Sequence, residues 1–445
     1  MRSSRLRLIG TNHNLRVFAT LLLCAAFLAP RASGQISFSR GVGREMLKDI
    51  KRDLKDKYYD PTFRGKDLDA HFKAAEELIE RAETTDQVYT VVAQSLMDFD
   101  DSHLYFIPPM WSASAEYGWR MKMVGKAAYV VAVRPGSDAE IKGLRPGDEI
   151  LSVDGFVPER ATLWKMDYYY YALAPKPGMV LTVKSPDGKT RQLQVAAKIT
   201  KGKLVQDVGG HDWYQRQIEA EKDARLYTNR FADFGNDLLI WKMPTFSLEP
   251  DKVNEGMNRA RNHKAVIIDL RGNGGGYIVS LLALLGNFFD HDLKLGDIKS
   301  RKEAKPLIAK TRGGNGVYNG KLIVLVDSES ASASELFARG VQLEKRGTVL
   351  GDLTAGAVMV SQFYEHKVGI KEFLLYGVSI TVQDLLMTDG KSLEHAGVTP
   401  DEVSLPSGAD LAARRDPVLA RAAALAGVGL DVEKAGALFP EIWRK

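Results

Sequence analysis

The sequence predicts a multidomain α/β protein. Its 445 residues are enough for two to four domains at roughly 100–200 residues each. Hydrophobic residues make up 45% of the chain and charged residues 26%, as is ordinary for folded globular proteins. Helical periodicity dominates the first part, strand patterns the middle, and alternating strands and helices the second half.

The N-terminus, residues 1–34, is typical of a secretory signal peptide. It holds five arginines and no acidic residue, then an apolar run at 17–29 and the small residues Ala32-Ser33-Gly34. The run is shorter than the roughly 20 residues that span a bilayer. We expect cleavage after Gly34 and export to the periplasm or the medium, with no stable membrane span afterwards. A permanent N-terminal anchor is the alternative.

The remaining composition excludes several classes of protein. Without the leader the chain has 56 basic and 56 acidic residues, so the pI near 8.9 gives no argument for a nucleic-acid partner. The single cysteine, Cys24, lies in the leader and excludes a disulfide framework. Zinc-protease, P-loop and dinucleotide-binding motifs are absent from the sequence, so we expect no metal and no cofactor.

Residues 35–109 are predicted to be a helical region. Apolar side chains recur at helical spacing from Met46 to Tyr58, again over 72–82 and again over 87–97. Thr84 and Thr85 are plausible capping residues between the last two helices.

Residues 110–200 predict a separate strand-rich domain. Strand patterns at 128–133 and 180–183 are separated by Pro-Gly and Asp-Gly turns. Residues 143–155 (GLRPGDEILSVDG) resemble the signature of PDZ domains of the bacterial protease type. The resemblance implies a PDZ-like domain that binds an extended peptide and captures its terminal carboxylate at the loop Tyr117-Gly118-Trp119. The alternative is a PDZ fold that only packs or gates.

The second half predicts an α/β core. Residues 201–235 read as a polar connector, and 236–405 alternate buried strands (238–241, 265–270, 322–326) with helices (279–289, 333–344). Residues 406–445 are expected to form a helical tail, with an Ala-rich helix over 408–427.

Two segments of this core could carry chemistry. Residues 269–276 (DLRGNGGG) follow a buried strand, and glycines there let backbone N–H groups face a developing oxyanion. Residues 328–335 (SESASASE) precede a helix, where a serine lies in a positive field. Taken alone, the glycine segment could be a plain turn, and the serine segment could hold an ordinary N-cap. Both segments in this order favour a catalytic serine.

The pair resembles the tail-specific, or C-terminal processing, serine peptidases. Residues 58–61 (YYDP), 101–103 (DSH) and 397–401 (GVTPD) resemble the same family, so the resemblance covers most of 45–405. It implies a crotonase-like ββα-superhelix core with a PDZ domain ahead of it. By position in the motif, Ser332 is the nucleophile.

The resemblance also implies an oxyanion hole. Its donors would be the N–H of Ala333 and that of one turn glycine, Gly274 or Gly275.

One position departs from the members of this family that use a serine and a lysine, the Ser–Lys members. In those members a lysine about 25 residues beyond the nucleophile acts as the base. Ala357 stands there, and no lysine occurs between Lys345 and Lys367.

The tricorn-core branch of the family offers a different base. Carried over residue by residue, His103 is the base for Ser332, and Ser102 and Glu394 orient and polarise it. An unperturbed imidazole titrates near pH ~6.5 and can activate a hydroxyl that is otherwise inert. His395 is a competing candidate, whereas we expect Asp101 to cap or pair locally.

Together these features predict an exported serine endopeptidase with a histidine base. Its substrates would be polypeptides with flexible, free C-terminal tails, recruited by the PDZ-like domain. A catalytically inactive, peptide-binding scaffold of the same fold is the alternative. An esterase or small-ligand binder on this fold is a third reading. The joint presence of Ser332, the glycine turn, His103 and Glu394 favours the enzyme over the scaffold.

Overall fold

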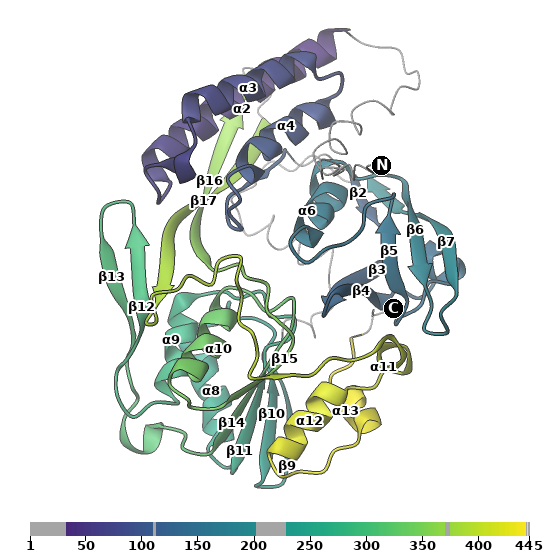
Figure 1. The fold of residues 1–445 in the computed structure, drawn as a ribbon. Helices are drawn as coiled ribbons and strands as arrows, with labels where there is room; N and C mark the ends of the chain where they lie inside the picture. The colour runs from purple at the N-terminus through teal and green to yellow at the C-terminus, as the bar shows by residue number, and fades with distance from the viewer. Residues whose placement is uncertain (1–32, 110–112, 202–227, 370–373, 442, 444–445) are drawn as a thin grey trace, which may run out of the picture.

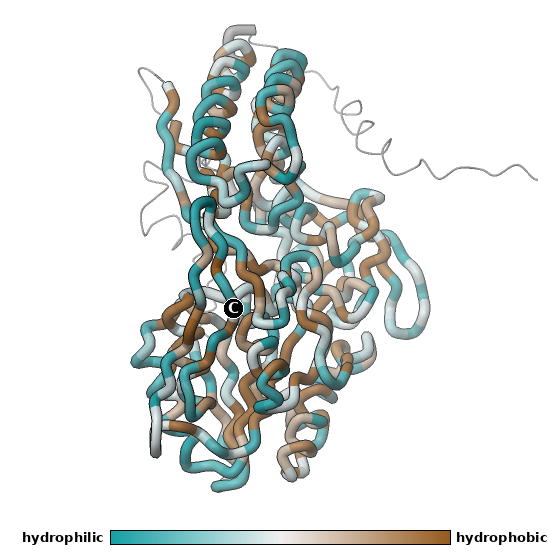
Figure 2. Tube along the Cα trace, turned by 60° about the vertical axis from the view of Figure 1, so that its left-hand side comes forward, coloured by the Kyte–Doolittle hydropathy of each residue, from teal (hydrophilic) through white to brown (hydrophobic). Residues whose placement is uncertain are grey.

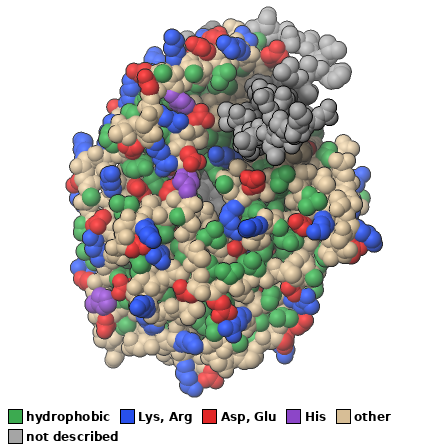
Figure 3. Space-filling model, viewed as in Figure 1, with side chains coloured by type: hydrophobic (Ala, Val, Ile, Leu, Met, Phe, Trp, Pro, Cys, Tyr) green, Lys and Arg blue, Asp and Glu red, His purple; other side chains and the backbone are tan. Residues whose placement is uncertain are grey.

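The computed structural model describes residues 33–109, 113–201, 228–369, 374–441 and 443, and shows a mixed α/β multidomain fold (Figure 1). The expected run 17–29 and Cys24 lie outside these residues, as does most of the expected connector. Among the described residues, no helix has both the length and the apolar character that crossing a membrane requires. Charges of both signs are interspersed over the face shown in Figure 3.

Three N-terminal helices lie at one end of the molecule (Figure 1). They are α2 (Ser33–Lys57), α3 (Leu68–Arg81) and α4 (Thr85–Met97), with a short 3-10 turn, η1 (Phe63–Gly65), between the first two. The side chain of Thr84 accepts a hydrogen bond from Gln87 N at 3.2 Å, which confirms the predicted cap of α4. Hydrophobic and hydrophilic residues alternate along these helices in Figure 2, and the hydrophobic ones, such as Leu47, Phe72 and Val92, are buried in one shared core.

A long hairpin joins these helices to the rest of the protein. It consists of β16 (Met359–Val368) and β17 (Leu374–Met387). β17 pairs with β1 (Tyr105–Ile107) and with β12 (Leu293–Ser300), which pairs with β13 (Ala304–Ala309). The N-terminal region and the second half of the chain therefore share one sheet.

The middle of the chain forms a five-stranded antiparallel sheet with the order β3-β4-β5-β6-β7. Its strands are β3 (Trp119–Val124), β4 (Ala127–Val133), β5 (Glu149–Val153), β6 (Gly178–Lys184) and β7 (Thr190–Ala196). Around it lie β2 (Ala113–Glu116), β8 (Lys198–Lys201), α5 (Asp138–Ile141), α6 (Leu163–Tyr168) and the π-helical turn η2 (Tyr169–Leu173). β3 is an edge strand of this sheet.

The core of the second half is a six-stranded sheet with the order β18-β15-β14-β11-β10-β9. Its strands are β9 (Arg230–Phe234), β10 (Leu238–Lys242), β11 (Ala265–Asp269), β14 (Lys321–Val326), β15 (Thr348–Gly351) and β18 (Glu402–Val403). All neighbours pair in parallel except β9 with β10. The predicted strands of this half are confirmed.

Helices cover both faces of this sheet, as expected for buried parallel strands (Figure 1). On one face lie α8 (Pro250–Ala260), α9 (Ile278–Gly286) and α10 (Ala333–Leu343); on the other lie α12 (Pro417–Leu425) and α13 (Val432–Leu438). Alternate residues of β10 face opposite cores: Trp241 contacts the first and Ile240 the second. A 3-10 turn, η3 (Gly314–Gly316), precedes β14.

Two sequence expectations need correction. The expected connector 201–235 contains β9, which pairs with β10 across a three-residue turn in which Gly235 has a φ of 56°. The expected helix 408–427 is broken after α11 (Gly408–Ala413), because Arg414 adopts a left-handed φ of 56° and Pro417 starts a new helix.

Candidate active site

The two motifs meet at the carboxyl ends of neighbouring parallel strands. β11 leads into the glycine turn 270–276, β14 into the serine loop 327–332, and β15 into the loop 352–358. In open α/β sheets, ligands bind where the strands end at this edge. The topology therefore brings the two predicted segments together.

The backbone of Asn273 ties the glycine turn to the serine loop. Asn273 O accepts hydrogen bonds from Ala331 N at 3.0 Å and Ser334 Oγ at 2.9 Å. Its amide side chain is fully buried and donates to Met243 O at 2.8 Å. The two segments are thus fixed relative to one another by a residue that the sequence argument did not single out.

Ser332 adopts an unusual backbone conformation directly before α10. Its φ is 54° and its ψ is −116°, which is unfavourable for a residue with a Cβ. A Cβ at Gly275 would lie 2.7 Å from Ser332 Cβ and 3.1 Å from Ala333 N, so only glycine allows this approach. Such strain next to a close backbone contact is characteristic of functional sites.

The oxyanion-hole candidates differ in their hydrogen bonds. Gly275 N donates to Asn273 Oδ1 at 2.9 Å, so this amide is already used. Gly274 is exposed, and Ala333 is the first residue of α10, where an amide has no intrahelical partner. Of the two predicted glycines, the geometry favours Gly274, together with Ala333.

Ser102, His103 and Glu394 are brought into direct contact. Ser102 Oγ lies 2.7 Å from His103 Nδ1 and donates to Glu394 Oε2 at 2.9 Å. Ser102 N also donates to Glu394 Oε1, at 2.9 Å. The hydroxyl has one proton and gives it to the carboxylate, so it accepts from the Nδ1–H of His103. This relay leaves Nε2 as the basic nitrogen of the ring.

The environment of His103 favours its neutral form. Burial lowers the pKa of His103 below its ordinary value of 6.5, although Glu394 and Asp101 act in the opposite direction. Asp101 itself is buried and accepts from Tyr58 OH, Thr381 Oγ1 and the backbone N of His103. Only the bond from His103 N is the local pairing expected from the sequence, because Tyr58 and Thr381 are 43 and 280 positions away.

The contacts of Ser102, His103 and Glu394 are joined to Ser332 through the loop 352–358. Glu394 Oε2 accepts from Val358 N at 2.8 Å, and the preceding carbonyl, Ala357 O, accepts from Ser332 N at 2.9 Å. Ala357, at the position where the Ser–Lys members carry their lysine, therefore contacts Ser332 through its backbone.

His395 makes its hydrogen bond outside this relay. Its Nε2 lies 2.7 Å from Asp100 O and 3.7 Å from Asp100 Oδ2, and 48% of the side chain is exposed. Its Nε2 is 3.6 Å from Glu394 Oε1, beyond hydrogen-bond distance. Of the two histidines, the geometry favours His103.

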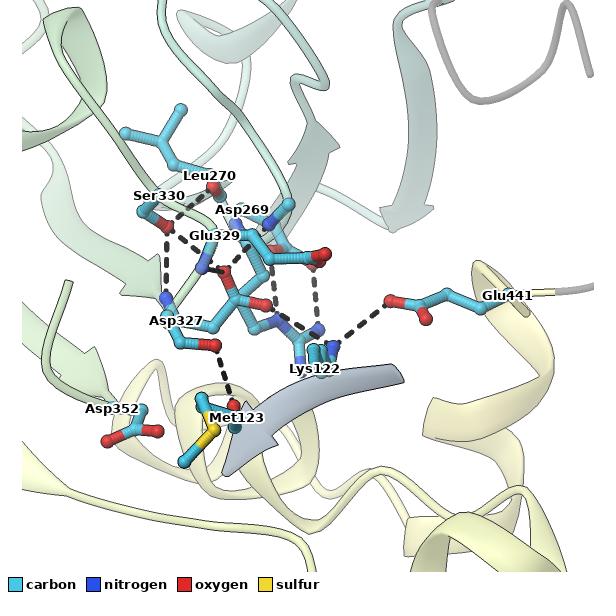
Figure 4. A network of polar contacts seen from close by, with 12 residues as sticks. Lys122, Met123, Asp269, Leu270, Asp327, Glu329, Ser330, Asp352 and Glu441 are labelled. Carbon is cyan, nitrogen blue, oxygen red and sulfur yellow. Dashed lines mark hydrogen bonds and ion pairs between the residues drawn. The ribbon is translucent and has the colours of Figure 1, made fainter. Parts of the chain in front are cut away.

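Asp327 connects the serine loop to both the glycine turn and the five-stranded sheet (Figure 4). Its Oδ1 accepts from Gly272 N at 2.8 Å, and its Oδ2 from Lys122 Nζ on β3 at 3.3 Å. Lys122 Nζ also donates to Glu441 near the C-terminus, at 3.1 Å. The adjacent Ser328 Oγ donates to Met123 O at 2.6 Å. The edge strand β3 is thus held directly against the loop that precedes Ser332.

The predicted peptide-capture loop lies apart from these residues, at the start of β3. Tyr117 and Gly118 line a cavity of about 450 Å³ that Arg134 and Lys198 also border. Trp119 is buried like Tyr117 but does not line the cavity, and its indole N–H lacks a hydrogen-bond partner in the described structure. No group of three or more His, Cys, Asp or Glu side chains within the described ranges is placed to hold a metal ion.

Sequence reasoning missed Glu335, which accepts a hydrogen bond from Ser332 N at 3.1 Å. Its signal was present, because Ser-x-x-Glu before an apolar run is a capping-box pattern. It also missed Asp327, whose partners Gly272 and Lys122 are distant in sequence.

Comparison with family models gives two matches. Residues 237–404 match the model "Peptidase family S41", and residues 43–96 match "Tricorn protease C1 domain". The first range contains the glycine turn, Ser332 and Glu394.

Two curated relatives are similar over most of the chain. A tail-specific protease of Haemophilus influenzae is 27% identical over 60% of this chain and 37% of its own length. A chloroplastic C-terminal processing peptidase of Tetradesmus obliquus is 24% identical, over 77% of this chain and 73% of its own. The chain thus spans little more than a third of the first relative.

A solved structure shares the fold. Mature CPAF in complex with lactacystin superposes with a TM-score of 0.64 at 16% identity, covering 84% of this chain and 95% of CPAF. At this identity the likeness concerns the fold alone.

Proposed function

The chain belongs to peptidase family S41 through residues 237–404, and from this premise we propose that it is a serine endopeptidase with a histidine base. Its substrates are polypeptides with flexible, free C-terminal tails. The observation that carries the proposal is the relay Glu394–Ser102–His103, joined through Val358 and Ala357 to a strained Ser332.

The proposed reaction proceeds through an acyl-enzyme. His103 Nε2 takes the proton of Ser332 Oγ as this oxygen attacks the scissile carbonyl, and later returns it to the leaving amine. The amides of Ala333 and Gly274 donate to the oxyanion of the tetrahedral intermediate. Water then attacks the acyl carbon, with His103 again as base, and releases the product and Ser332.

Glu394 acts behind the base in this scheme, so its loss should cost less than loss of the base. We expect Glu394→Gln to lower kcat about 10²-fold. The backbone N–H groups of Ser102 and Val358 donate to the carboxylate of Glu394, and in the variant one of them would face the N–H₂ of the new amide. Steady-state kinetics on a peptide substrate measures this. The exposed Glu303→Gln is the matched control and should retain wild-type kinetics. A loss as large as that of His103→Ala, or no loss, would contradict the assigned role.

We propose that the middle sheet is a PDZ-like domain and that it recruits these tails. The core of the second half is proposed to be crotonase-like, as the family resemblance implies. The support is the cavity beside Tyr117 and Gly118, which lies at the start of β3, an edge strand of this sheet. Arg134 and Lys198 border this cavity together with Glu116 and Asp138, and Arg134 pairs with Glu116, so a terminal carboxylate would be held mainly by backbone N–H groups.

Tail capture predicts a preference for free acids. In full-length Ser332→Ala protein, a peptide acid should bind more tightly than its amide by about 1.5–3 kcal/mol, measured by calorimetry. Gly118→Ala should abolish this preference, because φ is 73° there and the new Cβ would lie 2.5 Å from Ser137 Cβ. Gly188→Ala, also at positive φ but in open space, is the control. Equal affinity for acid and amide would leave only a packing or gating role.

We further propose that the protein is exported. The support is the basic and apolar character of residues 1–34, together with the absence of any charge excess in the rest of the chain.

A further inference from the structure

Glu335 is a buried carboxylate that the mechanism above does not use. It lies on the first turn of α10, three residues after Ser332, and is fully buried. Its Oε2 accepts from Ser332 N at 3.1 Å and from Ala357 N at 2.9 Å. Its Oε1 accepts from Gly356 N at 2.8 Å and from the hydroxyl of Thr354.

Every one of these contacts requires an acceptor on Glu335. Three donors are backbone amides, and the Thr354 hydroxyl accepts from Val398 N at 2.6 Å, which directs its proton to the carboxylate. Burial raises the pKa of Glu335 to about 7, against the lowering effect of these four hydrogen bonds. The ion pairs of the described residues include none to Glu335, so backbone dipoles rather than a cation hold it. Burying such a group is costly unless its hydrogen bonds are complete, as they are here.

The carboxylate of Glu335 joins two segments whose relative position the proposed reaction depends on. One is the N-terminus of α10, with the left-handed Ser332; the other is the loop 354–358. That loop accepts from Ser332 N through Ala357 O, and donates to Glu394 through Val358 N. Moving the loop would therefore shift the nucleophile and the carboxylate behind the base together.

We propose that Glu335 is a positioning residue: it locks the nucleophile's backbone onto the loop 354–358 and so aligns Ser332 with the His103 relay. The inference rests on the proposed function. Glu335 touches neither substrate nor reacting atoms, and its effect reaches the reaction through Ser332.

The test is the rate at which a fluorophosphonate probe labels Ser332 in full-length protein. Glu335→Gln places amide hydrogens against backbone donors at nearly constant volume. We expect the labelling rate constant and kcat to fall about 10²-fold, the cost of a small misplacement of a nucleophile, with little change in KM. The final titre of labelled sites should stay complete. A merely structural role would instead lower the titre and leave the rate per active site unchanged.

Three further variants make the test decisive. Glu335→Asp keeps the charge and should recover part of the labelling rate, and it replaces Glu335→Gln should that variant not fold. Thr354→Ser keeps the hydroxyl donor and should retain most of the activity. Glu344→Gln, exposed at the end of the same helix, is the matched control.

A wild-type labelling rate in Glu335→Gln, or a reduced titre with an unchanged rate, would overturn the positioning role. Ser332→Ala in the same series separates this outcome from failure of the proposed function. If Ser332→Ala still hydrolyses peptide, the proposed function fails; if only that variant is inactive and Glu335→Gln is normal, the positioning role alone fails.

Discussion

Replacing Ser332 by alanine is expected to lower kcat by on the order of 10⁴-fold or more, and His103→Ala should cost about as much. Neither residue can perform its step without the other, because the hydroxyl needs a base and the base needs a nucleophile. The double variant should therefore be little worse than either single one. Steady-state kinetics on a peptide with a free C-terminus measures all three.

His395→Ala is the matched control for this comparison. Its imidazole is half exposed and lies against Asp100 O, so the variant should keep near-full activity. If His395→Ala is inactive while His103→Ala is active, the two histidines have been assigned the wrong roles. If neither Ser332→Ala nor His103→Ala changes turnover, the acyl-enzyme mechanism is wrong.

Asp269→Ala is expected to destabilise the core by about 3–5 kcal/mol, because it leaves the largely buried Lys242 without its carboxylate and Arg271 with Asp416 alone. Asp269 is fully buried at the end of β11. It accepts from Lys242 Nζ at 3.2 Å and from both Arg271 Nε at 2.9 Å and a terminal guanidinium nitrogen at 2.8 Å. Burial alone would raise the pKa of Asp269, yet Arg271 and Lys242 lower it below its ordinary value. The glycine turn begins directly after this cluster, so peptidase activity should fall as well.

Urea unfolding followed by circular dichroism measures the change in stability. Asp187→Ala is the matched control: Asp187 pairs with Lys189 in an exposed turn, and its loss should leave the transition unchanged. A shift for Asp269→Ala no larger than that of the control would show that the cluster does not stabilise the core.

The strands of the second half, and the place of Ser332 at their carboxyl ends, could be predicted from sequence because their signals are local. Ile267 and Val324 lie in short apolar runs that become parallel strands buried on both faces. The glycine turn and the serine loop follow two of these strands directly, so strand order alone places Ser332 near Gly275. The curated relatives and family models agree with the family that these motifs suggested.

The remaining features depend on contacts between distant residues. Ser102 and Glu394 are 292 positions apart, and their contact follows only from the hairpin β16–β17 that joins the N-terminal region to the core. Glu335 reads as an ordinary helix cap until the loop bearing Ala357 is seen to close over it. Arg414 ended a predicted helix by adopting a left-handed conformation, which an Ala-rich pattern does not reveal.

The most direct test of the central claim is covalent labelling by a fluorophosphonate across a pH series, with the modified residue mapped by mass spectrometry. The account predicts a single adduct on Ser332. Its formation rate should rise with pH through an apparent pKa below 6.5, because burial lowers the pKa of His103 and keeps the base neutral to lower pH. The same rise should be lost in His103→Ala. An adduct on another residue, no adduct at all, or an unchanged labelling rate in His103→Ala would contradict the account.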